Sequence, residues 1–206
     1  MKKNLSTFFA FFCFVILVLF LGVSAVDSVS SSTIYGKVLR LHVLANSDSK
    51  EDIEMKYRVR DALLDVTGRL FLDCENVEDA LERANENKRL LCDVARGVLD
   101  DGGCAKDVNV VIGKEDYPEK TYSTLTFPEG EYLSVRVIIG NGDGKNWWCV
   151  LFPPLCNAGI TDDDGRLLVS YGIDENEVKK LEEQERKNSF EIFGCRVKLK
   201  ILDYLK

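Results

Sequence analysis

The chain has 206 residues, of which 46% are apolar and 30% are charged, and its 34 acidic and 27 basic side chains give a net charge of −7. A chain of this length can bury a substantial core as one domain of ordinary size. The acidic balance argues against a nucleic-acid-binding protein, because such proteins neutralise phosphates with clustered Lys and Arg. His42 is the single histidine, which excludes a multi-histidine metal site, and no glycine-rich phosphate-binding motif occurs. We therefore expect no cofactor and no metal, and most familiar enzyme classes are disfavoured.

Residues 1–25 carry the pattern of an export signal. Lys2 and Lys3 precede an unbroken apolar run over residues 8–21, and small residues follow, with Ala25 at the predicted cleavage position. The run itself is shorter than the roughly 20 residues that span a bilayer, but the wider stretch from Leu5 to Val26 comes close to that length. An uncleaved amino-terminal membrane anchor is therefore the alternative to a cleaved signal peptide.

Either reading places the remainder of the chain outside the cytoplasm. Residues 26–36 are rich in serine and predict a short flexible leader. Residues 37–206 are then expected to form a single extracytoplasmic domain.

The first predicted element of that domain is a strand over residues 37–45. Apolar Leu39, Leu41 and Val43 alternate with Arg40 and His42, so that one face of the strand is apolar throughout. The polar cluster at 46–49 is typical of a helix N-cap, with Asp48 and Glu51 or Ser49 and Asp52 as a capping box. The helix that begins there is expected to end near Phe71.

The later elements follow from the same periodicities. They are a helix over 77–99, a strand over 107–113, an antiparallel hairpin of 120–127 with 132–139, an acidic turn at 161–165, a helix over 175–188 capped by Asp174, and a final strand over 190–205. This order predicts an α+β fold of two layers, with a mostly antiparallel sheet and two principal helices.

The cysteines allow disulfides but do not specify them. Apart from Cys13 in the apolar segment, the chain has Cys74, Cys92, Cys104, Cys149, Cys156 and Cys195. Cys149 and Cys156 flank Pro153-Pro154 and form the best local candidate pair, because proline there bends the chain. Free buried thiols are the competing reading. A zinc site is disfavoured because no Cys-x-x-Cys pair is present.

Two polar features could carry chemistry, and each has a simpler structural explanation. His42 could activate the Cys149 thiol as the base of an exported thiol hydrolase, although a strand histidine bonded to a neighbour needs fewer assumptions. The acidic clusters at 47–52 and 162–164 could bind a hard cation, but neither has the spacing of a calcium loop. Helix capping and a solvated turn explain them more simply.

The stretch NWWCVLFPPLC (146–156) is the most unusual of the chain. Its aromatic and proline residues could close the open end of a small core. Alternatively, a glycine-rich approach over 140–144 and a stiff Pro-Pro bend could present them to a partner protein, since Trp and Phe are rich sources of interface energy. The sequence leaves both readings open.

Two segments resemble the signature regions of the stage II sporulation protein R family: RLHVLANSDSKEDIEMKYRVRDALL (40–64) and RVIIGNGDGKNWWCVLFPPLC (136–156). Their order and spacing, the preceding signal segment and the basic-apolar strand at 196–202 agree with that family. The resemblance implies a signalling protein that is made in the forespore and exported into the space between the two compartment membranes. There such a protein triggers a membrane-embedded aspartic protease, which removes the pro-sequence of an early mother-cell sigma factor. No catalytic residues carry over from the family.

We therefore hypothesise a partner-binding surface drawn from both signature regions. It comprises Trp147, Trp148, Phe152, Pro153, Pro154, His42, Asn46 and Asp48. The rival hypotheses are the cell-envelope thiol hydrolase that uses Cys149 and His42, and an anchored scaffold for envelope assembly that needs an uncleaved amino terminus.

Overall fold

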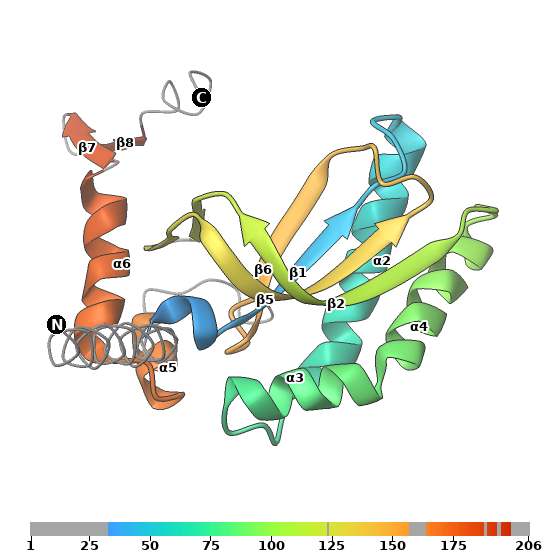
Figure 1. Ribbon diagram of the computed structural model, residues 1–206. Coiled ribbons are helices and arrows are strands. Elements are labelled where there is room, and N and C mark those ends of the chain that lie inside the picture. The colour runs from blue at the N-terminus through green and yellow to red at the C-terminus, as the bar shows by residue number, and fades with distance from the viewer. Residues whose placement is uncertain (1–32, 123, 157–163, 188, 193–194, 199–206) are drawn as a thin grey trace, which may run out of the picture. The chain divides into compact units, whose positions relative to one another are not determined.

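The computed structural model describes residues 33–122, 124–156, 164–187, 189–192 and 195–198 (Figure 1). Its elements are η1 (Ile34–Gly36), β1 (Leu39–Leu44), α2 (Lys50–Leu70), α3 (Val77–Glu86), α4 (Lys88–Asp101), β2 (Val108–Tyr117), β3 (Lys120–Tyr122), β4 (Leu125–Phe127), β5 (Gly130–Ile139), β6 (Asn146–Phe152), α5 (Asp164–Ser170), α6 (Glu175–Lys187), β7 (Ser189–Ile192) and β8 (Cys195–Lys198). The predicted export segment and residues 26–32 of the predicted leader lie outside the described residues. Within the described ranges, no helix is both long and apolar enough to cross a membrane.

The main sheet has four strands in the order β2-β5-β1-β6. β1 runs parallel to β5 and antiparallel to β6, and β2 runs antiparallel to β5. The fold is α+β as predicted, but the sheet is mixed, so a mostly antiparallel character is not confirmed. The reason is topological: β5 returns from β2 and inserts beside β1, which brings together two strands that are distant in the sequence.

The predicted hairpin of 120–127 with 132–139 is wrong. β5 pairs along its whole length with β2, from Val108 opposite Ile139 to Tyr117 opposite Gly130, whereas β3 and β4 pair only with each other. Pro118 separates β2 from β3, and Pro128 separates β4 from β5. Because proline lacks an N–H, the two prolines interrupt the ladder of one long hairpin and set its tip apart as a separate two-stranded sheet.

The helices begin and end at recognisable caps. Ser49 Oγ accepts a hydrogen bond from the Asp52 backbone N–H at 3.1 Å, and α2 ends at Leu70 with Phe71 as C-cap, which confirms the predicted limits. The predicted helix over 77–99 is instead divided at Asn87, whose side chain donates to the Arg83 carbonyl at 2.9 Å and terminates α3. The structure therefore has three helices, α2, α3 and α4, where two principal helices were predicted.

The carboxyl-terminal region follows the prediction in part. Asp174 Oδ1 accepts from the Asn176 N–H at 2.9 Å at the start of α6, as predicted. The acidic turn overlaps α5, since that helix begins at Asp164, and residues 161–163 lie outside the described part. The single strand predicted over 190–205 is instead the antiparallel pair of β7 and β8, and residues 199–206 lie outside the description.

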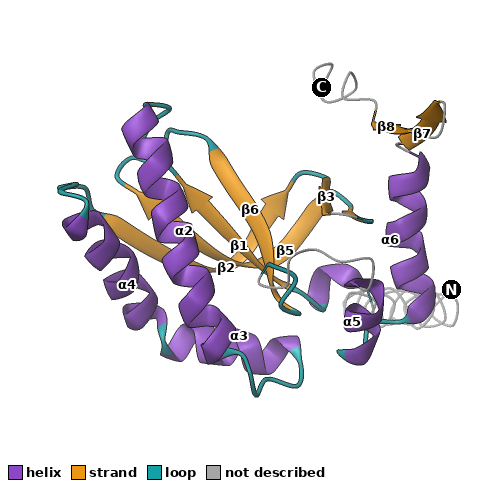
Figure 2. Ribbon diagram, turned by 180° about the vertical axis from the view of Figure 1, so that it is seen from behind, coloured by secondary structure: helices purple, strands orange, loops and turns teal. Residues whose placement is uncertain are grey.

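The alternation of β1 divides the core into two clusters, one on each face of the sheet. Leu39, Leu41 and Val43 face α2, α3 and α4, which cover one face (Figure 2). The opposite face packs against η1, the β3–β4 tip, α5 and α6. That second cluster comprises Ile34, Val38, Tyr117, Leu125, Phe127, Tyr132, Val150, Leu155, Leu168, Ile173, Val178 and Leu181.

Candidate partner-binding site

Two loops that carry the sequence signatures meet at one end of the sheet. Asn46 Oδ1 accepts a hydrogen bond from the Asn141 N–H at 3.1 Å, and Asp48 Oδ1 accepts from the Lys145 N–H at 2.7 Å. The β1–α2 connection therefore holds the glycine-rich β5–β6 loop in place. We hypothesised that Asn46 and Asp48 face a partner, but these side-chain oxygens accept hydrogen bonds from the protein's own backbone.

A second layer of polar contacts supports this junction from α2. Asp52 accepts from Asn46 Nδ2 at 2.7 Å and from Ser47 Oγ at 2.6 Å, and these hydrogen bonds lower the pKa of Asp52. Lys56 is buried and donates to the Lys145 carbonyl at 2.9 Å. Burial lowers the pKa of Lys56 because the ammonium loses hydration there. The junction is a rigid frame beside the first residues of β6.

His42 lies on the sheet face opposite α2, within a network of polar side chains. Its Nδ1 lies 2.9 Å from Glu115 Oε1 and its Nε2 lies 3.0 Å from Asn146 Oδ1. Glu115 also accepts from Ser134 Oγ at 2.8 Å and from Arg136 Nη1 at 3.3 Å. Only 7% of His42 is exposed, so the hydrogen-bonded strand histidine is the reading that the geometry favours.

The indole of Trp148 closes this network. Its ring stacks on His42 with centroids 5.3 Å apart, and the Lys120 ammonium lies 4.5 Å from the Trp148 ring. Lys120 comes from the hairpin tip, so the tip and β1 hold the ring between them. Trp148 is half-buried and remains accessible to a partner.

Trp147 lies on the other face of β6, because consecutive strand residues point in opposite directions. The Arg60 guanidinium from α2 lies 5.1 Å from the Trp147 ring and 4.7 Å from the ring of Tyr57, and 40% of Tyr57 is exposed. Arg60 also pairs with Asp61 at 2.6 Å. The two tryptophans therefore flank the end of β6 from both faces rather than forming one continuous surface.

The structure corrects the part of the hypothesis that concerns the proline bend. Phe152 is 1% exposed and packs edge-to-face on Tyr171 with centroids 5.0 Å apart. Pro153, which follows a cis peptide bond, is buried, and Pro154 is half-buried. Phe152 and Pro153 belong to the core because the chain turns back into the protein after β6, so neither is available to a partner.

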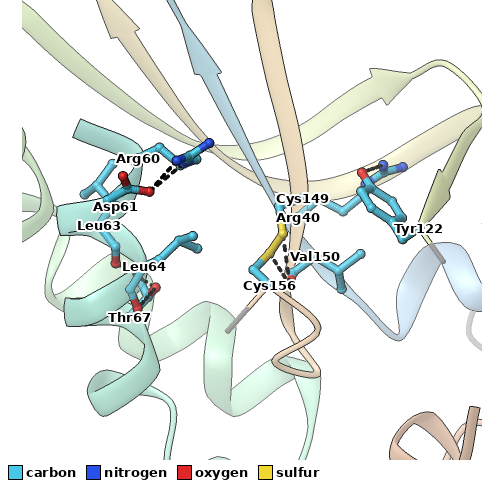
Figure 3. The surroundings of a disulfide bond; sticks show 10 residues. All are labelled: Arg40, Arg60, Asp61, Leu63, Leu64, Thr67, Tyr122, Cys149, Val150 and Cys156. Atoms are coloured by element: carbon cyan, nitrogen blue, oxygen red, sulfur yellow. Dashed lines mark hydrogen bonds and ion pairs between the residues drawn. A yellow bond between two sulfur atoms is a disulfide. The ribbon is translucent and has the colours of Figure 1, made fainter. Parts of the chain in front are cut away.

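Cys149 and Cys156 are joined by a disulfide with their Cα atoms 6.0 Å apart. Cys149 lies opposite Leu41 in the ladder, whereas His42 lies opposite Trp148, so the thiol position and the imidazole point to opposite faces of the sheet. Figure 3 shows the disulfide beside β6, with Arg60 and Arg40 on different sides of the strands. The pair required by the thiol-hydrolase hypothesis is therefore not assembled. No cluster of His, Cys, Asp and Glu suited to a metal occurs among the described residues.

Sequence reasoning missed Glu115, Arg136 and the two cations that contact the tryptophans. Glu115 lies 73 positions from His42, and the strand that carries it extends to Tyr117, beyond the predicted limit at residue 113. One signal was available: with β2 extended, alternation places Glu115 on the same face as Tyr117. Only the register of β2, β5 and β1 brings this carboxylate to His42.

The Glu115 carboxylate offers a test of this network through pH. Burial raises its pKa, but the hydrogen bonds from His42 and Ser134 and the charges of His42 and Arg136 outweigh burial, so the net pKa is lowered. A lowered pKa stabilises the folded state above the unfolded pKa, and this stability is lost as pH falls through the folded pKa.

Glu115→Gln is expected to lower the free energy of unfolding at neutral pH by about 1–3 kcal/mol, since it removes the charged acceptor. It should also flatten the fall in stability between roughly pH 5 and pH 3 relative to the unchanged chain. Urea unfolding over this pH range measures both effects. Glu131→Gln, which removes the 55%-exposed partner of Lys114, is the control and should change stability little. Equal pH profiles for the unchanged chain and Glu115→Gln would contradict the assignment.

Comparison with known proteins identifies the family. The family model described as stage II sporulation protein R matches residues 35–162, which include both signature regions and the junction between them. The chain belongs to the stage II sporulation protein R family. It is 36% identical to Stage II sporulation protein R of Bacillus subtilis (strain 168) over 120 residues, which are 58% of this chain and 54% of that protein. The chain thus spans about half the length of this curated relative. No solved structure matches the chain.

Proposed function

We propose that this member of the stage II sporulation protein R family is exported from the forespore and acts as an activating ligand in the intermembrane space. Its receptor would be a membrane-embedded aspartic protease, which then removes the pro-sequence of an early mother-cell sigma factor. The observation that carries the proposal is the family match over residues 35–162. The lysines and the apolar run at the amino terminus support export.

The geometry supports a ligand rather than the rival hydrolase. The Cys149–Cys156 disulfide and the opposite directions of Cys149 and His42 leave that nucleophile and base apart. The two signature regions instead build a rigid junction next to two accessible tryptophans. Activation by such a ligand requires that it bind the active state of the receptor more tightly than the inactive state, because only this difference shifts the equilibrium.

Reconstitution tests the function directly. The chain with its export signal is co-expressed with a candidate receptor protease and the sigma-factor precursor, and cleavage of the precursor is followed on immunoblots. We expect cleavage only when all three proteins are present. No cleavage in the complete system, with export of the chain verified, would contradict the function.

The site is tested in the same assay with the double variant Trp147→Ala/Trp148→Ala. We expect cleavage to fall by at least about tenfold, because truncation of interface tryptophans commonly costs 2 kcal/mol or more. Leu72→Ala is the matched control, since Leu72 is 75% exposed at the far end of α2 and should be dispensable. Circular dichroism verifies that the double variant is folded. Full cleavage with a folded double variant would remove the tryptophans from the binding site.

A further inference from the structure

β6 is an edge strand of the main sheet. It pairs with β1 on one side, and no other strand in the described part of the chain pairs with its outer side. Along such an edge, alternate backbone N–H and C=O groups point outward and can pair with an added strand. Its sequence, NWWCVLF, contains no charged residue.

By contrast, the opposite edge of the sheet, formed by β2, is protected against pairing with another strand. β2 carries Lys114, Glu115 and Asp116 in succession, and Lys114 forms an ion pair with Glu131 at 2.9 Å. Charged residues on an edge strand are a common means of preventing pairing with another chain. The two edges therefore differ in charge: β2 carries charged residues that oppose strand addition, and β6 carries none.

The accessible part of the β6 edge is its first three residues. Asn146 is exposed and Trp147 and Trp148 are half-buried, whereas Cys149 and Val150 are 6% and 0% exposed. A strand added here would lie beside β6 in the plane of the sheet, with one indole ring next to it on each face. Its side chains would alternate between these rings, as in other cases of strand addition.

Cations surround this open segment. Arg60 lies over the Trp147 ring at 5.1 Å, Lys120 lies over the Trp148 ring at 4.5 Å, and exposed Lys145 directly precedes the strand. Arg60 pairs with the Asp61 carboxylate at 2.6 Å, and the Asp48 carboxylate accepts the Lys145 backbone N–H at 2.7 Å. Each face of the segment therefore presents a cation over its indole ring, although the whole chain carries a net charge of −7.

We propose that the open edge at Asn146–Trp148 binds an extended, acidic segment of the partner protein as an added β-strand. The backbone of β6 supplies the hydrogen bonds, and the cations on the two faces select carboxylates on neighbouring side chains of that segment, which point to opposite faces. A second copy of this chain fits less well, because two-fold pairing of β6 would bring both sets of cations together. The identity of the partner as the receptor protease rests on the proposed function, whereas the mode of binding rests on the edge alone.

The two tryptophans are the only ones in the chain, so their fluorescence reports on this edge alone. The full-length chain in detergent is titrated with a short peptide that repeats Glu-Glu-Val-Val, which places carboxylates on both faces of a strand, and with its counterpart that has lysine in place of glutamate. We expect the acidic peptide to change the tryptophan emission in a salt-sensitive manner and to bind at least roughly tenfold more tightly than the lysine peptide. Equal binding of the two peptides overturns the charge assignment.

Backbone pairing is tested with two further acidic peptides, each N-methylated at alternate amides but in opposite phase. Strand addition predicts that one phase abolishes binding and the other retains it, since only alternate N–H groups face the edge. Equal affinity for both phases, or loss of binding in both, overturns strand addition. Light scattering that shows dimers dissociated by Asn146→Lys would assign the edge to a second copy and would also overturn the proposal.

Variants of the chain complete the test. Arg60→Glu/Lys120→Glu is expected to weaken binding of the acidic peptide at least roughly tenfold, whereas Lys114→Glu on the opposite edge should leave it unchanged. Unchanged binding by a folded double variant contradicts the proposal. A chain that triggers cleavage of the precursor but binds no acidic strand overturns this inference alone. A chain that binds the strand but triggers no cleavage overturns the proposed function alone.

Discussion

Gly144→Ala is expected to lower the free energy of unfolding by about 2–4 kcal/mol. A Cβ atom at Gly144 would lie 2.2 Å from the Ser47 carbonyl oxygen and 2.5 Å from its carbon. Both are backbone atoms of the β1–α2 connection, so no side-chain rotation relieves the clash. The Gly144 N–H also donates to the Ala45 carbonyl at 2.9 Å, and the shift needed to accommodate alanine would strain this bond.

The matched control is Gly97→Ala. Gly97 lies exposed within α4, and a Cβ atom there meets nothing within 4 Å. Because alanine is the better helix former, this variant should raise the free energy of unfolding by about 0.5–1 kcal/mol. Chemical denaturation of both variants measures the difference. Similar stability of Gly144→Ala and the unchanged chain would mean that the two signature loops are not packed as described. It would also contradict the description of the frame beside the tryptophans.

Replacement of Arg40 is expected to give the second large change in the free energy of unfolding, and the size of this change depends on the residue that replaces it. The side chain is fully buried, with its guanidinium 4.0 Å from the Tyr117 ring and 4.7 Å from the Tyr132 ring. It donates to Tyr122 Oη at 2.8 Å, while Nε and Nη1 have no hydrogen-bond partner within the described residues. Burial raises the pKa of both Tyr117 and Tyr132, so neither supplies a negative charge to balance Arg40.

Arg40→Ala should therefore lower the free energy of unfolding by about 3–4 kcal/mol, because it leaves a cavity among the aromatic rings. Arg40→Met should lower it by less than about 1 kcal/mol, or raise it, since methionine fills much of the volume and removes a buried charge whose hydrogen bonds are incomplete. Urea unfolding of the two variants side by side measures this contrast. An equal loss in both would show that the charge itself stabilises the fold through the aromatic rings.

Packing around the sheet brings together residues that are distant in the sequence, as the surroundings of Arg40 show. Alternation places Arg40 on the face of β1 that points away from Leu39 and Leu41, but only the hairpin tip that carries Tyr122 encloses its side chain. A charged residue in such a strand is ordinarily expected at the surface. Its burial depends on a segment 82 positions away, which no local pattern reports.

Some residues of the predicted partner surface are buried or bonded within the protein, and local sequence patterns did not report this either. Phe152 and Pro153 share the composition of an interface segment, and composition alone cannot distinguish an aromatic ring in the core from one at the surface. Asn46 and Asp48 were placed in the right neighbourhood, yet their oxygens accept hydrogen bonds from the β5–β6 loop. Trp147 and Trp148 remain partly exposed at the candidate site, His42 is buried and stacks on the Trp148 ring, and Glu115, Arg60 and Lys120 join the site through long-range contacts.

The sequence by itself determined what depends on neighbouring residues: the apolar face of β1, the Ser49 cap and the end of α2 at Leu70. These features follow from periodicity and from backbone groups that are satisfied within one or two turns. Only the tertiary structure decided that β5 lies parallel to β1, that Glu115 meets His42 and that none of the described strands pairs with the outer side of β6. Strand order and register depend on the sum of contacts between segments that are far apart in the chain, so the pattern of any one segment is compatible with several neighbours.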